Sequence, residues 1–202
     1  MIVSTNAIKV LVVVLVMILS LTACGLRPSP PSIQTALPEV LSATAPLAGA
    51  QDDSPVQSNI ALETTLCETF STFAYEVVRL VNIERAREGL PPVEMHPLLM
   101  IAAQMRAFES LETLALSHTR PDGRDWYTVL SEAPGLDLRS AGENLARGQR
   151  TPERVLKSWM NSPEHRYNIM LQEWHTIGVG IAQNNDGRME WVQIFGPALV
   201  AD

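Results

Sequence analysis

The last part of the chain predicts a β-hairpin with apolar side chains on both faces. Residues 177–181 form one expected strand, residues 184–187 (Asn-Asn-Asp-Gly) the turn, and residues 189–195 the partner strand. Side chains of the second strand alternate between two apolar faces, with Met189, Trp191 and Phe195 on one and Val192 and Ile194 on the other. A sheet that is apolar on both faces needs a cover on each. The expected fold is therefore α+β, a three-layer α-β-α sandwich with a small, mainly antiparallel sheet.

Two longer helices are expected upstream of this hairpin. The first has apolar residues at helical spacing from Leu66 and ends near Gly89, with two prolines beyond it as stop signals. The second starts at His96-Pro97, where proline suits the first helical position. Its expected core stripe is Leu98, Ile101, Ala102, Met105 and Phe108, with Arg106 and Glu109 facing outward or flanking it.

Shorter elements are expected between the second helix and the hairpin. A turn at residues 121–123 (Pro-Asp-Gly) precedes a short helix over residues 125–131, and an ion pair between Arg120 and Asp122 is expected to brace this loop. Residues 140–147 are expected to be extended. Thr151 and Ser162 each precede a proline and a glutamate, a pattern typical of a helix start.

The first residues predict export. Residues 10–21 are almost continuously apolar, a length that suits a signal peptide better than a membrane span. They end in Leu21-Thr22-Ala23-Cys24-Gly25, the pattern of a bacterial lipobox. We predict a lipoprotein signal peptide over 1–23 and lipidation of Cys24, which would anchor an extracytoplasmic protein to a membrane. The alternative is an uncleaved N-terminal anchor with an incidental cysteine.

The region after the signal predicts a linker and then one domain. Residues 24–62 are rich in proline, serine and threonine and hold six of the fourteen prolines, so we expect a disordered linker. Residues 63–202 are long enough for a single core. Cys67 would be the one cysteine of the mature chain that is not lipidated, so no intramolecular disulfide is expected. A net charge of −7 without a dense basic run argues against nucleic acid as a partner.

Three side chains stand at turn-rich edges of separate elements: His118, Glu143 and His165. Two neutral imidazoles and a carboxylate that converge from separate segments can form a metal-binding cleft. His165 is expected in the first turn of its helix, whose positive end disfavours imidazolium. The alternative for each histidine is a surface or hydrogen-bonded structural residue.

These motifs resemble a known family in their order and spacing. Residues 80–90, 118–123, 142–146, 159–166 and 178–180 are similar to the bacterial branch of the CAP superfamily. That superfamily comprises cysteine-rich secretory proteins, antigen 5 and pathogenesis-related 1 proteins, and its domain is also called the SCP domain. The resemblance covers about residues 70–196 and implies an α-β-α sandwich.

The resemblance also implies a central cleft with two histidines and two acids, which in some members binds zinc or another divalent metal. The matching residues here are His118, Glu143 and His165. The second acid falls on Ser162, so this chain departs from the pattern there. Glu164 could replace that acid only if its side chain turns inward.

The resemblance favours a non-enzymatic binding module, with a lipid, a cell-envelope component or a protein as its ligand. A metal- or serine-dependent hydrolase, for instance a protease, is the alternative, with Ser117 or Ser162 near a His/Glu pair. A third possibility is a structural envelope protein whose cleft has no function.

Overall fold

The structure is a computed structural model that describes residues 55–132 and 140–198. The expected signal peptide, Cys24 and the linker up to residue 54 lie outside the described residues. The chain divides into two compact units, residues 1–65 and 66–202, and the second holds the whole sheet. Among the described residues, no helix combines the length and the apolar character that crossing a bilayer requires.

Four strands form one mixed sheet in the order β1-β3-β4-β2. The predicted hairpin is present as β3 (Thr176–Gln183) and β4 (Met189–Gly196), which pair antiparallel. Strand β2 (Gly142–Arg147) pairs antiparallel with β4. Strand β1 (Glu94–Met95), which the sequence analysis missed, runs parallel to β3. The mainly antiparallel sheet is therefore confirmed, with one short parallel edge.

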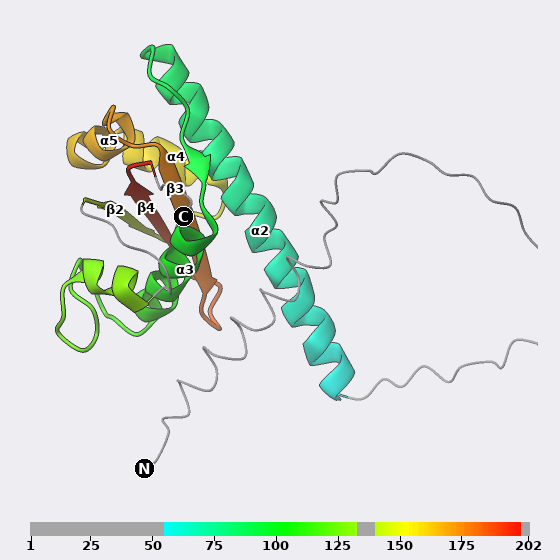
Figure 1. Cartoon of the computed structure of the whole chain (residues 1–202). Coiled ribbons are helices and arrows are strands. Elements are labelled where there is room, and N and C mark those ends of the chain that lie inside the picture. The colour runs from blue at the N-terminus through cyan, green and yellow to red at the C-terminus, as the bar shows by residue number, and fades with distance from the viewer. Residues whose placement is uncertain (1–54, 133–139, 199–202) are drawn as a thin grey trace, which may run out of the picture. The chain divides into compact units, whose positions relative to one another are not determined.

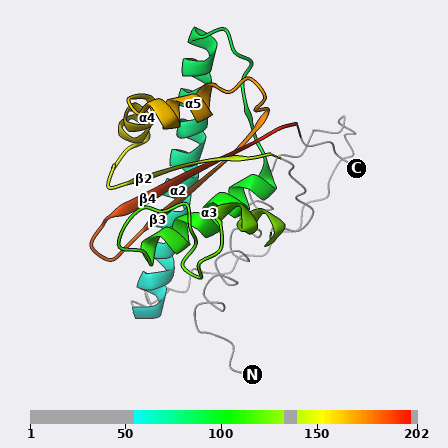
Figure 2. The same cartoon turned by 90° about the vertical axis from the view of Figure 1, so that its left-hand side faces the viewer.

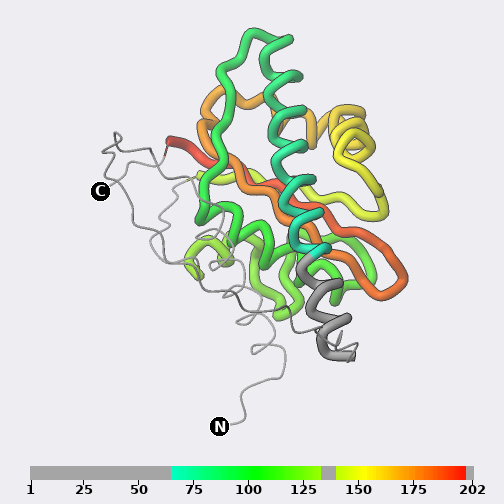
Figure 3. Tube along the Cα trace, turned by 90° about the vertical axis from the view of Figure 1, so that its right-hand side faces the viewer, coloured from blue at the N-terminus to red at the C-terminus, as the bar shows by residue number. Residues whose placement is uncertain are grey.

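Helices cover both faces of this sheet, which confirms the three-layer prediction. On one side lie α2 (Pro55–Arg87), α4 (Pro152–Met160) and α5 (Pro163–Met170), and on the other lie α3 (Pro97–Leu111) and the 3-10 helix η1 (Trp126–Glu132). Figure 2 shows the strands between α4 and α5 on one side and α3 on the other. Figure 1 and Figure 3 give two further views of this arrangement, and in both α2 crosses the sheet.

Helix α2 starts earlier than expected and ends as expected. It begins at Pro55, inside the range predicted as linker, and its last residue is Arg87. The other helix starts agree with the sequence: α4 is capped by Thr151, whose side chain accepts a hydrogen bond from the Arg154 N–H, and α5 follows Ser162. Ser162 makes no side-chain cap bond.

The core on the α2 side is built from large side chains. The predicted alternation of β4 is confirmed, because Met189, Trp191 and Phe195 belong to this cluster while Val192 and Ile194 belong to the opposite one. Trp191 stacks on Phe73 of α2 with ring centroids 5.9 Å apart.

The α3 side brings helix and strand close together, and here the predicted stripe is only partly right: Ala102 is buried, whereas Leu98, Ile101, Met105 and Phe108 are half-buried. Strand β3 presents Gly178 and Gly180 to α3, so the helix backbone comes very close to the strand. Apart from Leu99, the buried positions of α3 are accordingly small or polar: Ala102, Ala103, Gln104, Arg106, Ala107 and Ser110. Arg106, expected to face outward or to flank the stripe, is only 1% exposed.

A buried arginine fixes the end of α2 to the region around α5. Arg85 is fully buried and donates hydrogen bonds to four backbone carbonyls, those of Pro91, Ile169, Leu171 and Trp174. Burial lowers the pKa of its guanidinium from the usual value. These bonds tie the C-terminal end of α5 to the core, so the helix that carries His165 is held in place.

Candidate functional site

The structure brings His118, Glu143 and His165 to one open cleft of about 480 Å³. His118 lies in the loop after α3, Glu143 on β2 and His165 in the first turn of α5. The other lining residues come from α5: Pro163, Glu164, Tyr167 and Asn168. The predicted convergence of three separate segments is thus present in the geometry.

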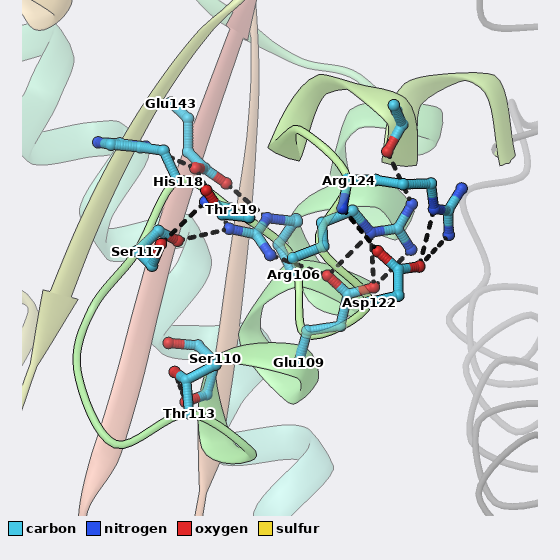
Figure 4. A network of polar contacts seen from close by, with 12 residues as sticks. Arg106, Glu109, Ser110, Thr113, Ser117, His118, Thr119, Asp122, Arg124 and Glu143 are labelled. Carbon is cyan, nitrogen blue, oxygen red and sulfur yellow. Dashed lines mark hydrogen bonds and ion pairs between the residues drawn. The ribbon is translucent and has the colours of Figure 1, made fainter.

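Glu143 is held from two sides at the bottom of this cleft. Its side chain is fully buried, and its Oε2 accepts from Arg106 Nε at 2.8 Å. Its Oε1 is 2.8 Å from Nδ1 of His118 and 3.4 Å from Nη2 of Arg106. Figure 4 shows Glu143 between these two side chains. The carboxylate charge is therefore compensated inside the protein, and both of its oxygens already have a hydrogen-bond partner.

The loop that carries His118 is fixed by its backbone as well. The carbonyl of Ser117 accepts from Arg106 Nη2 at 3.0 Å, and the carbonyl of His118 accepts from the Trp126 N–H at 2.9 Å. Because Nδ1 of His118 faces Glu143, Nε2 is the ring nitrogen left for a ligand. The His118 side chain is 58% exposed, so this nitrogen is accessible.

An ion-pair network continues from Arg106, through Glu109 and Arg120, to the 3-10 helix η1 that follows the loop carrying His118. Glu109 bonds both Arg106 and Arg120, and Arg120 also bonds Glu132 at the end of η1. The predicted pair between Arg120 and Asp122 is wrong, because Asp122 pairs with Arg124 instead (Figure 4). Arg120 is buried and turns inward toward the two glutamates, whereas Asp122 stays at the surface.

Two asparagines join α5 to β2 beneath the cleft. The side-chain amide of Asn144 donates to the carbonyl of His165 at 3.1 Å, and that of Asn168 donates to the carbonyl of Glu143 at 3.2 Å. Asn168 also donates to Asn144 Oδ1 at 3.0 Å. These bonds fix the position of His165 relative to Glu143 although the two residues belong to different layers.

The two histidines have opposite electrostatic environments. The hydrogen bond to Glu143 raises the pKa of His118 above 6.5, and its charge interaction with that carboxylate acts in the same direction. Burial lowers the pKa of His165 below 6.5, and the charge of His118 lowers it further. The sequence analysis expected a neutral His165 from the helix dipole. The structure agrees with the expected lowering of the His165 pKa, but burial of the ring is the main cause of this shift.

We expect NMR titration of the ring protons to give a pKa above 6.5 for His118 and below 6.5 for His165. Because its folded pKa is raised, His118 contributes stability below about pH 6.5, and this is lost as the pH rises through its folded pKa. His165 contributes in the opposite sense: its full contribution is present above about pH 6.5 and falls as the pH drops toward its folded pKa. A His118 pKa that stays unchanged in Glu143→Gln would contradict the assigned cause.

The sequence patterns did not predict Tyr167 and Asn168 as lining residues of the cleft, or Arg106 as the residue that holds Glu143. Arg106 is three residues from Ala103 and seven from Leu99, which is the spacing of one helix face, and this signal could have placed it inward. Tyr167 and Asn168 follow His165 directly on α5 but carry no pattern of their own.

Comparisons with known proteins agree with the geometry of the domain. The family model described as the CAP cysteine-rich secretory protein family matches residues 78–195, more than half of the chain. The chain belongs to this family. The uncharacterized protein YkwD of Bacillus subtilis (strain 168) is 35% identical to the CAP protein over 134 residues. This alignment covers 65% of the CAP protein and 51% of YkwD, so the chain spans about half the length of that relative.

Solved structures share the CAP fold at low sequence identity. An extracellular SCP-domain protein from Bacillus anthracis gives a TM-score of 0.59 at 21% identity, over 77% of this chain and 45% of that one. An outer surface protein from Borrelia burgdorferi gives 0.55 at 22% identity, over 60% of this chain and 90% of that one. These likenesses establish the α+β fold.

The donor set of the CAP cleft does not fit a three-ligand metal site. Glu143 already serves Arg106 and His118 with both oxygens, and Ser162 stands where the second acid was expected. Glu164 lines the cleft, yet within residues 55–132 and 140–198 no three His, Cys, Asp or Glu side chains gather closely enough to hold a metal ion. Zinc binding itself needs a direct titration.

A calorimetric titration with zinc tests this point. We expect no micromolar binding by the wild-type protein, because no three His, Cys, Asp or Glu side chains of the described residues gather closely enough to supply the usual zinc ligand set. Micromolar binding that disappears in both His118→Ala and His165→Ala would contradict the expectation. His175→Ala is the matched control, since His175 is exposed and lies outside the cleft.

Proposed function

We propose that this CAP domain is an extracytoplasmic binding module whose ligand occupies the cleft between His118 and α5. The observation that carries the proposal is the fixed arrangement of two imidazoles over a buried, charge-compensated carboxylate. A cleft of about 480 Å³ falls within the range of about 300–1,000 Å³ that is common for small-molecule sites. The lipids, cell-envelope components and proteins expected from the family are the ligand classes to test.

Binding is favoured over catalysis because the described residues supply no activated nucleophile. Within that part of the chain, no hydroxyl or thiol hydrogen bonds to the ring of His118 or His165. Ser117 Oγ instead accepts from the Thr119 N–H, and Ser162 precedes α5 as its cap residue. A serine-dependent mechanism needs a hydroxyl within hydrogen-bond reach of its base.

One observation keeps a hydrolase as the second candidate. The pairing of His118 with Glu143 at 2.8 Å fixes the imidazole in the orientation that a general base toward water requires. Peptide-library and casein turnover that is abolished by His118→Ala would support this candidate. Turnover that survives the substitution would come from another source.

The location of the protein is a further part of the proposal. The apolar segment and the lipobox at Cys24 support export and lipid anchoring. Two structural relatives, one an extracellular protein and the other an outer surface protein, agree with an extracytoplasmic place. Labelled palmitate in the growth medium should enter the wild-type chain and be absent from Cys24→Ser. Equal labelling of both chains, or of neither, would rule out the anchor.

The binding proposal is tested with the full chain in detergent micelles. Phospholipid, oleate, soluble cell-wall fragments and envelope protein extracts are offered to the wild type, His118→Ala, His165→Ala and the control His175→Ala. We expect at least one ligand whose affinity falls in both cleft variants and not in the control. If every affinity is the same in all four proteins, the cleft is not the binding site.

A further inference from the structure

The side chains that line the cleft are almost all hydrogen-bonding groups. Of the seven lining residues, only Pro163 lacks a polar side chain; the others are His118, Glu143, Glu164, His165, Tyr167 and Asn168. Several of these groups have donor or acceptor atoms that no described residue bonds. Among the described residues, nothing hydrogen bonds to Nε2 of His118, to the carboxylate of Glu164 or to the hydroxyl of Tyr167.

This lining disfavours an apolar ligand. A fatty acyl chain in the cleft would displace water from the imidazoles, the carboxylate and the hydroxyl without replacing their hydrogen bonds. Each polar group that is buried in this way without a hydrogen-bond partner costs free energy. A ligand that fills this cleft well must bring hydrogen-bonding groups of its own.

The charges disfavour an anionic ligand. Two carboxylates, Glu143 and Glu164, line the cleft, and no lysine or arginine from the described ranges does. The nearest guanidinium, that of Arg106, is buried and already bonded to Glu143 and Glu109. A phosphate or sulfate would therefore meet the carboxylate of Glu164 without a lysine or arginine at the cleft to balance it. An uncharged ligand fits this arrangement better.

Flat apolar surfaces lie beside these acceptors. Tyr167 is 65% exposed, although large aromatic rings are usually buried, and Pro163, one turn earlier on the same helix face, is exposed as well. A pyranose ring has the complementary chemistry, because its axial C–H groups form an apolar face and its equatorial hydroxyls donate and accept around the rim. Exposed aromatic rings bind such faces while the polar groups around them bind the hydroxyls.

We infer that the cleft binds an uncharged oligosaccharide, with the sugar face on Tyr167 and hydroxyls on His118 Nε2 and Glu164. This inference rests on the proposed binding function and names its ligand class. His118 Nε2 accepts from a hydroxyl when the ring is neutral and donates to one when it is protonated, so a sugar hydroxyl suits both states. Neither state demands a charged partner.

The test uses the full chain in detergent micelles with two uncharged probes, cellotetraose and the tetramer of N-acetylglucosamine. Binding is followed by NMR of the histidine and tyrosine rings in the wild type, Tyr167→Ala, Tyr167→Phe and Tyr75→Ala. Tyr75 is the matched control, because it is 58% exposed, lies on α2 and does not line this cleft. Loss of the ring should weaken binding about tenfold, and the phenylalanine variant should keep most of the affinity. The control should bind as the wild type does.

Other outcomes would overturn the inference in distinguishable ways. If neither probe binds while oleate or inorganic phosphate binds in the wild type and fails to bind in His118→Ala, the ligand class is wrong and the binding function stands. If the oligosaccharides bind equally to the wild type and Tyr167→Ala, the sugar does not rest on this ring. If no probe of any class binds and the wider ligand screen is also negative, both the inference and the proposed function fail.

Discussion

Replacing Arg106 with methionine is expected to lower the free energy of unfolding by about 3–5 kcal/mol, as measured by urea denaturation. The reason is Glu143, whose side chain is fully buried and bonded by Arg106 at 2.8 Å. Removing the guanidinium leaves a carboxylate out of water without its compensating charge. The carbonyl of Ser117 and the carboxylate of Glu109 lose a donor at the same time.

The double variant Arg106→Met/Glu143→Leu separates a charge effect from a packing effect. Removing both charges together should recover a substantial part of the loss, because buried ion pairs are often replaced by apolar residues at little cost. The double-mutant cycle should then give a large coupling free energy. If the two single losses simply add up in the double variant, Arg106 acts through packing and its role at Glu143 is wrong.

The elements of the fold were largely predictable from the sequence because their signals are local. Periodicity and turn residues placed β3 and β4, and proline after a cap residue placed α4 and α5. Strand β1 was not predictable, since two residues carry no period and their pairing with β3 depends on tertiary structure. The start of α2 at Pro55 was missed because the composition of the segment before it indicated a linker.

The three cleft residues were predictable, whereas the groups that hold them were not. His118, Glu143 and His165 lie in motifs that resemble a family, and the structure places them around one cleft. Arg106 was expected to face outward or to flank the apolar stripe, because a charged residue in such a place is usually exposed. Its burial depends on a carboxylate 37 residues away on β2, and no local pattern reports such a partner.

The same limit explains why the buried stripe of α3 was predicted only in part. Sequence periodicity favoured the long apolar side chains of Leu98, Met105 and Phe108, which the structure leaves partly buried. The fully buried face is the alanine face, because β3 offers glycines there instead of side chains. Which side chains of α3 are buried therefore depends on the strand that the helix packs against.

Replacing Gly180 with alanine is expected to cost at least about 3 kcal/mol, the upper part of the range for overpacking. An added Cβ would lie 2.1 Å from the carbonyl oxygen of Ala103, which belongs to helix backbone and cannot rotate away. The control is Gly148→Ala, where no atom lies within 4 Å of the new Cβ and only the positive φ of 91° is strained. That change should cost about 1–2 kcal/mol.

The Gly180 variant should also disturb the cleft, although the residue does not line it. The clash is relieved only if α3 moves away from β3, and Arg106 lies on α3 one turn after Ala103. Displacement of Arg106 relaxes its bonds to Glu143, and with them the position of His118. We expect the NMR signals of the His118 ring to shift in Gly180→Ala and to stay unchanged in Gly148→Ala. A destabilised Gly180→Ala protein with unaltered His118 signals would mean that the packing of α3 and the geometry of the cleft are independent.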